Sequence, residues 1–295
     1  MSRSNKKTIV ITMGDPQGIG SEVTIKALAQ KSILGQGQFM VVGNKKLLRG
    51  LHPSVAVVDV PYKTAGEGSL KFLDKAIALI KGGVADALVT APLSKEAVSR
   101  YHHGFVGHTE YLAQAFEVKN FDMMFIASDL RLTIVTRHVP LKDVPKLITQ
   151  KAVFDSIALM AQTLKERFKI RRPKIAVLGL NPHAGEGGLI GTEDIKHILP
   201  AIRQAKTQGI NALGPLPADI FFAFRGSYDG VIAMYHDQGL APLKGMYMKE
   251  LVNFTAGLPF VRTSPAHGTA FDIAGKNKAD PSSMSAAIKL ACQLA

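Results

Sequence analysis

Short runs of apolar residues alternate along the chain with longer segments in which apolar residues recur at helical spacing. A short continuous apolar run favours a buried strand, and a spacing of three to four residues favours an amphipathic helix. Their regular alternation is typical of βαβ units around a mostly parallel sheet. The predicted strands are residues 8–13, 39–43, 55–60, 87–90, 123–127, 132–136, 174–180 and 230–235, and the predicted helices are residues 21–30, 69–81, 143–168, 192–208 and 283–294.

This pattern runs through all 295 residues without an internal repeat, a low-complexity tract or an obvious linker. The length suits two modest domains or one large one, and 46% hydrophobic residues supply a substantial core. We predict an α/β protein with two α/β/α subdomains, a central cleft, and the last helix packed back on the N-terminal half. The first subdomain would comprise residues 1–105 and 268–295. Residues 106–267 would form the second and carry most of the metal and substrate residues.

The apolar runs, the N-terminal residues and the cysteine content indicate the cellular compartment of the protein. No run approaches the roughly 18 apolar residues that span a bilayer, and residues 1–7 are polar and basic with no apolar segment behind them. Cys292 is the single cysteine, which excludes an intramolecular disulfide and a cysteine-based zinc site. We therefore expect a cytoplasmic protein without a membrane partner, in which any metal is held by histidines and carboxylates.

The formal net charge of +13 is compatible with nucleic acid, an anionic membrane surface or small anions as partners. The basic residues are scattered as pairs such as Lys6-Lys7, Lys45-Lys46 and Arg171-Arg172, and the sequence has no zinc-finger spacing or ribonucleoprotein motif. This distribution favours a solvated lysine-rich surface or attraction of phosphorylated small molecules, so we expect no nucleic-acid partner. A non-enzymatic anion or nucleic-acid binding protein is the alternative of a different class.

Three histidines occupy equivalent positions at or just after the ends of predicted strands: His138, His183 and His236. Because ligands of open α/β sheets gather outside the carboxyl ends of strands, distant loops can bring these imidazoles together. Three neutral imidazoles with open coordination positions suit a divalent metal such as Zn²⁺, Co²⁺ or Mn²⁺, which polarises a substrate hydroxyl or carbonyl. The alternative is that each histidine caps a strand end or bonds a nearby carbonyl.

Two acidic residues accompany these histidines. Asp237 directly follows His236 and is expected to orient its ring or the substrate. Glu186 shares with His183 the segment Asn181-Pro-His-Ala-Gly-Glu-Gly-Gly188, whose small residues allow backbone to approach a ligand. We interpret this segment as a functional loop in which Glu186 supports the ligands.

A glycine-rich segment, Gly14-Asp-Pro-Gln-Gly-Ile-Gly20, follows the first predicted strand and precedes a helix. Its N–H groups are placed to meet an anion at the helix N-terminus. The spacing matches neither the dinucleotide fingerprint nor the P-loop, and a tight strand-to-helix turn explains it equally well. The cofactor-binding residues are therefore unknown at this stage.

Further candidate anion donors are His108 and Thr109, within Gly107-His-Thr-Glu110, and the side chains of Lys244, Asn253 and Arg262. Each has a simpler explanation. Thr109 can cap the following helix, and Lys244 and Arg262 can be solvated surface cations.

Seven segments together resemble the 4-hydroxythreonine-4-phosphate dehydrogenases, and they keep that family's order along the chain. They are Met13-Gly-Asp-Pro-Gln-Gly-Ile-Gly20, Gly107-His-Thr-Glu110, Asn181-Pro-His-Ala-Gly-Glu-Gly-Gly188, Gly214-Pro-Leu-Pro-Ala-Asp219, Met234-Tyr-His-Asp-Gln-Gly239, Gly257-Leu-Pro-Phe-Val-Arg-Thr-Ser264 and His267-Gly-Thr-Ala270.

The resemblance implies an NAD- or NADP-dependent enzyme of pyridoxal 5′-phosphate biosynthesis that requires one divalent metal, with Zn²⁺, Mg²⁺, Co²⁺ and Mn²⁺ as candidates. Such an enzyme oxidises 4-phosphooxy-L-threonine to a β-keto acid, which loses CO₂ to give 3-amino-2-oxopropyl phosphate. It also implies the fold of isocitrate and isopropylmalate dehydrogenases, which holds a dinucleotide without the Rossmann motif, and a homodimer with its active sites at the interface.

Position by position, the resemblance assigns roles to eight residues besides Asp237. The metal ligands would be His138, His183 and His236, one of them donated across the dimer interface, and this is the set that the strand ends already indicate. The substrate contacts would be His108, Thr109, Lys244, Asn253 and Arg262. Lys244, His236 and Asp237 are the candidate catalytic residues, with Lys244 assisting proton transfer or stabilising charge.

The chain departs from the family in one place, because residues 43–68 form a shorter segment than is usual. Related enzymes act on the 4-phosphates of D-threonate or D-erythronate in sugar-acid catabolism and share nearly all of these motifs. Oxidation of such a sugar-acid phosphate is therefore the alternative function.

Overall fold

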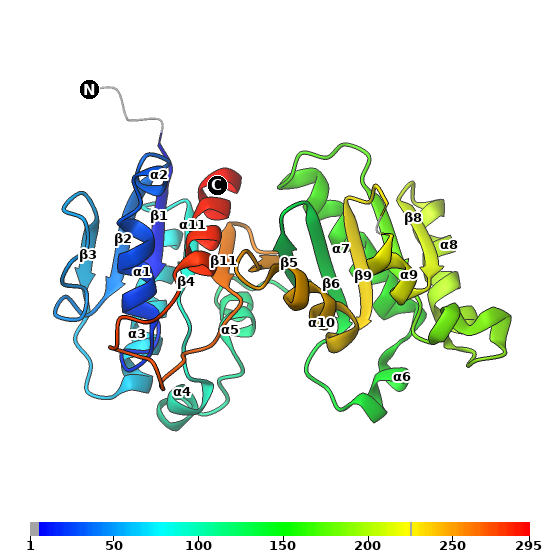
Figure 1. Ribbon diagram of the computed structural model, residues 1–295, viewed down its shortest axis with the longest axis horizontal. Coiled ribbons are helices and arrows are strands. Elements are labelled where there is room, and N and C mark those ends of the chain that lie inside the picture. Colours follow the sequence, from blue (N-terminus) through cyan, green and yellow to red (C-terminus); the bar gives the residue numbers. More distant parts are fainter. Residues whose placement is uncertain (1–5, 225) are drawn as a thin grey trace. The chain divides into compact units, whose positions relative to one another are not determined.

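The computed structural model describes residues 6–224 and 226–295, which divide into two compact units (Figure 1). Unit 1 combines the chain up to Lys119 with Lys249–Ala295, and unit 2 is Asn120–Met248. The first unit is built from both ends of the chain. Its boundaries, however, lie inside the predicted second subdomain, because β11 (Val261–Pro265) pairs with β4 (Ala87–Thr90) in one sheet.

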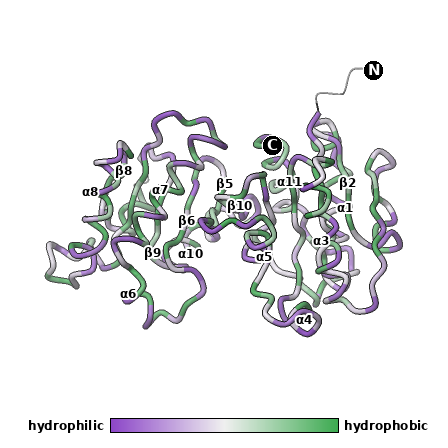
Figure 2. The backbone as a smooth tube through the Cα atoms, turned by 180° about the vertical axis from the view of Figure 1, so that it is seen from behind, coloured by the Kyte–Doolittle hydropathy of each residue, from purple (hydrophilic) through white to green (hydrophobic). Residues whose placement is uncertain are grey.

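The sheet of unit 1 has the strand order β3-β2-β1-β4-β11-β10. Neighbouring strands are parallel except for the antiparallel pair of β10 and β11. β1 and β4 are buried along almost their whole length, as their runs of apolar and β-branched residues require. Figure 2 shows the hydropathy of the residues along the chain, with hydrophobic residues in green. The remaining strand bounds are β1 Thr8–Thr12, β2 Gln38–Gly43, β3 Ala56–Asp59 and β10 Val252–Ala256.

Helices cover this sheet. α11 contacts β4, β10, β11 and α1, so the last helix does pack on N-terminal elements, and α3 contacts β1, β2, β4 and α4. α3 begins before the predicted residue 69 because Thr64 and Glu67 form a capping box at its N-terminus. The helices are α1 Gly20–Leu28, α2 Lys31–Leu34, α3 Ala65–Lys81, α4 Lys95–Tyr101, α5 His108–Ala115 and α11 Ser282–Leu294.

The sheet of unit 2 has the strand order β5-β6-β9-β7-β8. β5 and β6 form an antiparallel hairpin, and the other pairs are parallel. β9 lies between β6 and β7, so the carboxyl ends of these three strands are neighbours at one edge. The bounds are β5 Asp122–Ala127, β6 Leu130–Thr136, β7 Lys174–Leu178, β8 Asn211–Leu216 and β9 Gly230–Tyr235.

The helices of unit 2 are more divided than the sequence pattern indicates. The predicted helix 143–168 breaks at Ile148, and Thr149 starts a new helix by accepting a hydrogen bond from Ala152 N at 3.1 Å. The predicted helix 192–208 is a π-helical turn, Asp194–Ile198, followed by α8. The bounds are α6 Val144–Leu147, α7 Gln150–Glu166, α8 Leu199–Thr207, α9 Ala218–Ala223 and α10 His236–Tyr247, with 3₁₀ segments at Leu141–Asp143 and Pro182–Gly188.

All of the predicted strands are present; β4 and β9 have the predicted bounds, and the ends of the other six shift by one or two residues. The sequence pattern missed β8, β10 and β11, whose alternating or polar residues read as loop, and the helices α2, α4, α5, α9 and α10. Within residues 6–224 and 226–295, none of the helices has the length and apolar character needed to cross a membrane.

Candidate active site

The three candidate metal ligands follow three adjacent strands of unit 2. His138 comes after β6, His236 directly after β9, and His183 in the segment after β7. The rings of His138 and His236 lie with their centroids 5.5 Å apart and their planes at 43°. The expectation that strand ends would gather these histidines thus holds for this pair.

Side-chain hydrogen bonds tie the three strand ends together. Thr136 Oγ1 donates to the carbonyl of Met234 at 2.8 Å, which joins β6 to β9. Gln238 accepts from Met234 N at 2.6 Å and donates from Nε2 to the carbonyl of Gly179 at 2.6 Å, which joins β9 to the end of β7. These bonds fix the backbone next to His236. The sequence analysis did not select Gln238, since its partner Gly179 is 59 residues away.

His236 is the first residue of α10 rather than the last residue of a strand. Its Nδ1 lies 2.7 Å from a carboxylate oxygen of Asp237. A carboxylate in this position fixes the ring and holds the proton on Nδ1, which leaves Nε2 with a free lone pair. The pair therefore has the geometry of an oriented metal ligand or general base.

His183 lies in a strained loop. His183, Ala184, Gly185, Glu186 and Gly187 all have positive φ, from 41° to 80°. Three of these residues carry side chains, for which this conformation is unfavourable, and such strain is found mainly at functional sites. The loop exposes His183 and Glu186.

Within residues 6–224 and 226–295, no three or more His, Cys, Asp or Glu side chains are grouped so that they could hold one metal ion. His138 and His236 are brought together, and His183 does not complete a triad with them in this single chain. A complete three-histidine site therefore needs a shift of the His183 loop or a ligand from outside the chain.

Asp194, which the sequence analysis did not identify, organises the His183 loop from beneath. It is fully buried, and its carboxylate accepts hydrogen bonds from Leu180 N at 2.8 Å, Asn181 N at 3.2 Å and Asn181 Nδ2 at 2.8 Å. Gly179 packs directly against this carboxylate, since a Cβ there would lie 2.8 Å from Oδ1. No signal in the sequence marked Asp194, because its neighbours Glu193, Lys196 and His197 are also polar.

We predict that Asp194→Ala lowers the free energy of unfolding by about 3 kcal/mol, because it leaves the backbone amides of Leu180 and Asn181 without their acceptor and removes one of the two acceptors of Asn181 Nδ2. Urea unfolding of the two proteins measures the difference. Glu193→Ala is the control, since Glu193 accepts from the same Asn181 Nδ2, at 2.9 Å, but is partly exposed. This substitution should cost below about 1 kcal/mol. Equal effects of the two substitutions would show that Asp194 does not hold the loop.

Arg262, in unit 1, is the largest of the fully buried side chains among the described residues. Its side chain is 2% exposed, and its guanidinium donates to Thr255 Oγ1 at 3.1 Å and Thr90 Oγ1 at 2.5 Å. Its buried Nε has no hydrogen-bond partner in the described structure. Burial lowers the pKa of Arg262 to about 10, partly opposed by the charge of Glu110. The alternative that Arg262 is a solvated surface cation is therefore excluded, and this buried cation has donor capacity left for an anion.

His108 begins α5, after Gly107 at the N-cap position. Burial, and then the charges of Arg262 and Lys95, hold the pKa of His108 well below 6.5. The ring is thus neutral at pH 7 and faces two cations. Lys95 was not identified from the sequence; a Cβ on Gly107 would lie 3.5 Å from its Nζ, so it borders the same region.

The remaining substrate candidates have different settings. Thr109 is 4% exposed inside α5 and does not cap the helix, because Gly107 is the N-cap. Asn253, on β10, has a buried Oδ1 without a partner among the described residues. Lys244 is half-buried on α10 and belongs to unit 2, whereas His108, Thr109, Asn253 and Arg262 belong to unit 1.

The amides of the glycine-rich segment are used within the protein. Asp15 N donates to the Pro92 carbonyl, Gly18 N to the Asp15 carbonyl and Ile19 N to the Thr269 carbonyl, at 2.9 to 3.0 Å. Gln17 N donates to Asp15 Oδ1 at 2.9 Å. The structure therefore favours the tight turn over the anion cradle. Asp15 is 1% exposed and its Oδ2 has no partner in the part of the chain that the structure describes.

Comparison with known proteins covers both units. A family model described as "Pyridoxal phosphate biosynthetic protein PdxA" matches residues 6–291. A 4-hydroxythreonine-4-phosphate dehydrogenase of Geobacter metallireducens is 40% identical over 99% of this chain and 96% of its own length. A D-threonate 4-phosphate dehydrogenase of Pectobacterium atrosepticum is 39% identical over 98% of this chain and 99% of its own length.

Solved structures agree with these sequence relatives. The crystal structure of 4-hydroxythreonine-4-phosphate dehydrogenase from Klebsiella pneumoniae superposes with a TM-score of 0.87 at 37% identity, over 98% of this chain and 99% of that chain. Isocitrate dehydrogenase from Methylococcus capsulatus gives a TM-score of 0.51 at 14% identity, over 95% of this chain and 83% of that chain. The latter likeness concerns the fold alone, and it agrees with the predicted isocitrate dehydrogenase-like architecture.

Proposed function

The chain belongs to the PdxA family of pyridoxal phosphate biosynthetic proteins, and from this membership we propose that it oxidises 4-phosphooxy-L-threonine with NAD or NADP. The secondary alcohol loses its hydride to the nicotinamide and its proton to the protein or solvent. The resulting β-keto acid breaks its bond to the carboxylate and releases CO₂, which leaves 3-amino-2-oxopropyl phosphate. The observation that carries this proposal is the family match over residues 6–291, which includes every candidate site residue.

A second candidate is the same chemistry on the 4-phosphate of D-threonate or D-erythronate. It is supported by the Pectobacterium atrosepticum relative, whose identity to this chain, 39%, is close to the 40% of the Geobacter metallireducens relative. Both substrates carry a hydroxyl beside a carbon that bears the carboxylate, and both carry a phosphate. The proposed site therefore serves either substrate.

We propose that His138, His183 and His236 hold one divalent metal, with one of the three supplied by the second subunit of a homodimer. The donor set fits, because His138 and His236 lie with ring centroids 5.5 Å apart and Asp237 holds the Nδ1 side of His236. A bound divalent metal would supply Lewis-acid stabilisation of charge on the substrate oxygen. The protein's part is to aim the imidazole nitrogens and to keep them neutral.

Unit 1 would bind the anionic end of the substrate. Arg262 brings a buried positive charge, His108 and Thr109 add polar groups at the start of α5, and Asn253 adds an amide. Charge-assisted bonds from a buried guanidinium are among the strongest that a phosphate or carboxylate can find. Lys244 would assist proton transfer to or from the substrate.

The test of the function is formation of NADH by purified protein, with 4-phosphooxy-L-threonine and D-threonate 4-phosphate in parallel, each with and without chelator. Turnover of the first that chelator abolishes is the expected result. Faster turnover of the second would assign the enzyme to sugar-acid oxidation with the same site. No turnover of either with added metal would refute the proposed chemistry.

The depressed pKa of His108 predicts a pH effect on stability. Because its pKa in the folded protein lies below the ordinary 6.5, the unfolded chain binds the proton more tightly. Above about pH 6.5 the titration of His108 does not change the free energy of unfolding. As the pH falls below that value toward the folded pKa, this group lowers the free energy of unfolding by at most about 1.4 kcal/mol per pH unit. Thermal unfolding at pH 7.5 and 5.5 should therefore show a smaller loss in His108→Gln than in the parent protein.

A further inference from the structure

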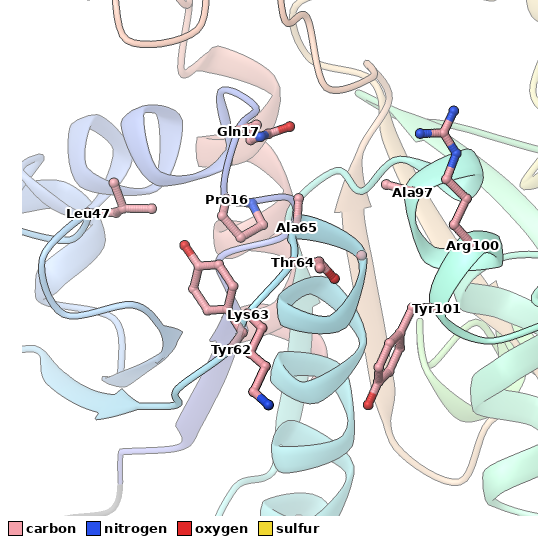
Figure 3. A pocket seen from close by; sticks show the side chains of 11 residues that line it. Pro16, Gln17, Leu47, Tyr62, Lys63, Thr64, Ala65, Ala97, Arg100 and Tyr101 are labelled. Atoms are coloured by element: carbon pink, nitrogen blue, oxygen red, sulfur yellow. The ribbon is translucent and has the colours of Figure 1, made fainter.

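Unit 1 contains a cavity of about 700 Å³ (Figure 3) that the proposed function does not use. Its lining comes from loops that follow β1, β2 and β3 and from α4, which follows β4. The cavity thus lies outside the carboxyl ends of parallel strands, where doubly wound sheets bind their ligands. Its volume is within the range of small-molecule sites. Neither the histidine set nor the residues assigned to the substrate line it.

The walls are fixed by close packing. The Tyr62 ring stands edge-on to Phe72 at 5.6 Å between centroids. It also packs on the bare backbone of Gly68, where a Cβ would lie 2.8 Å from the ring. At Gly66 a Cβ would overlap the Ala97 carbonyl oxygen, so α3 and α4 approach too closely for any side chain. One wall is therefore an aromatic surface that is already in position before a ligand arrives.

The lining is cationic. Lys63 and Arg100 contribute positive charges, and the described lining residues include no Asp or Glu. The first turn of α3 also lines the cavity. The capping box satisfies the backbone amides of Thr64 and Glu67. The backbone amides of the first two helical residues, Ala65 and Gly66, have no partner within the helix. Helix N-termini of this kind attract phosphate.

Three carboxylates lie near the cavity. Asp15 is buried next to the lining residue Pro16, and burial, followed by the charge of Asp15, raises the pKa of Tyr62. The other two are already paired within the chain. Glu67 is held by its capping bonds and by Lys71 at 2.8 Å. Glu96 pairs with Arg100 at 2.5 Å, but both side chains are about three-quarters exposed, so the pair is weak and a phosphate can replace it. The cavity therefore combines aromatic and apolar wall residues with two basic side chains, Lys63 and Arg100, which extend from different sides of it (Figure 3).

From these features we propose that the cavity binds a planar heteroaromatic ring that carries a phosphate group. Tyr62, Tyr101, Pro16 and Leu47 would contact the ring, and Lys63, Arg100 and the N-terminus of α3 would contact the phosphate. Two sources share this chemistry, the adenosine phosphate half of the dinucleotide cofactor and a free phosphorylated ring compound. Part of the cavity wall, from Leu47 to Gly66, belongs to the segment that is shorter than is usual in this family.

Isothermal titration of the full chain with AMP, pyridoxine 5′-phosphate, NAD and inorganic phosphate tests the proposal without any turnover. We expect saturable binding of at least one ring phosphate, at least about tenfold tighter than inorganic phosphate. The double variant Lys63→Ala with Arg100→Ala should weaken that binding at least about tenfold. Tyr101→Ala should weaken binding of the ring compound and leave inorganic phosphate unaffected. Lys75→Ala, which removes an exposed charge elsewhere on α3, should change nothing.

Competition then separates the two sources. Displacement of AMP by NAD would identify the cofactor as the occupant, and binding of pyridoxine 5′-phosphate that NAD does not displace would identify a free ligand. The proposal is overturned if no ring phosphate binds, if the double variant binds as the parent does, or if inorganic phosphate binds as tightly as the ring compounds. Because binding is measured directly, these outcomes do not depend on whether the proposed substrate is oxidised.

Discussion

His236→Ala is expected to lower kcat for the phosphorylated substrate by about 10³-fold or more, with little change in the unfolding midpoint. A lost ligand removes several kcal/mol of charge stabilisation at the reacting oxygen. His236 is only half-buried at the start of α10, and it is hydrogen-bonded to the exposed Asp237, so the core does not depend on it. Steady-state rates with saturating divalent metal, together with thermal unfolding, measure both effects.

Two further variants give this prediction its controls. Asp237→Asn keeps His236 but weakens the hydrogen bond that orients its ring. The kcat of this variant should therefore lie between those of the parent and of His236→Ala, about 10- to 100-fold below the parent. His103→Ala removes an exposed histidine of unit 1 and should have the parent rate. Full activity of His236→Ala in metal-depleted buffer would show that His236 is no metal ligand.

The strand ends could be predicted from the sequence because local patterns determine them. β4 and β9 have the predicted bounds, and parallel pairing of β6 with β9 makes His138 and His236 neighbours. The spacing of apolar residues along the chain predicts these strands. The same spacing does not predict β10 and β11, where Asn253 and Arg262 stand in place of apolar residues inside the strands. Polar residues inside these strands therefore concealed the strands from the sequence pattern.

The residues that hold the site together could not be predicted, because their partners are distant in sequence. Gln238 bonds to Gly179, and Arg262 bonds to Thr90 across 172 positions. Asp194 is buried beneath a loop whose left-handed residues follow no local propensity. Which polar side chain becomes buried is decided by the tertiary fold, and one sequence does not contain that information in a local pattern.

Arg262 illustrates the cost of such a site. Its cation is buried in unit 1, within reach of threonine hydroxyls at 3.1 Å and 2.5 Å, and none of the ion pairs found among the described residues includes it. Removing a charge from water costs several kcal/mol, and hydroxyl groups return only part of it. The folded protein bears this cost without ligand, and an incoming anion would offset it.

We therefore predict that Arg262→Met has opposite effects on stability and function. Methionine fills much of the same volume without a buried charge, so the free energy of unfolding should rise by about 1–3 kcal/mol, as when buried ions elsewhere are replaced by apolar residues. The KM for the phosphorylated substrate should rise at least about 100-fold, because a charge-assisted bond to its anionic end is lost. Urea unfolding and steady-state kinetics test the two halves separately.

Arg262→Lys distinguishes the charge from the shape of the donor. Lysine keeps a cation but not the planar fork, so it should lose stability, since two threonine hydroxyls lose their donors, and should recover only part of the affinity. If Arg262→Met is less stable than the parent and binds substrate normally, then Arg262 is a structural residue of the β4–β11 pair. If Arg262→Met is instead more stable than the parent and no longer binds substrate, then Arg262 is a binding residue whose buried charge destabilises unit 1 until an anion binds.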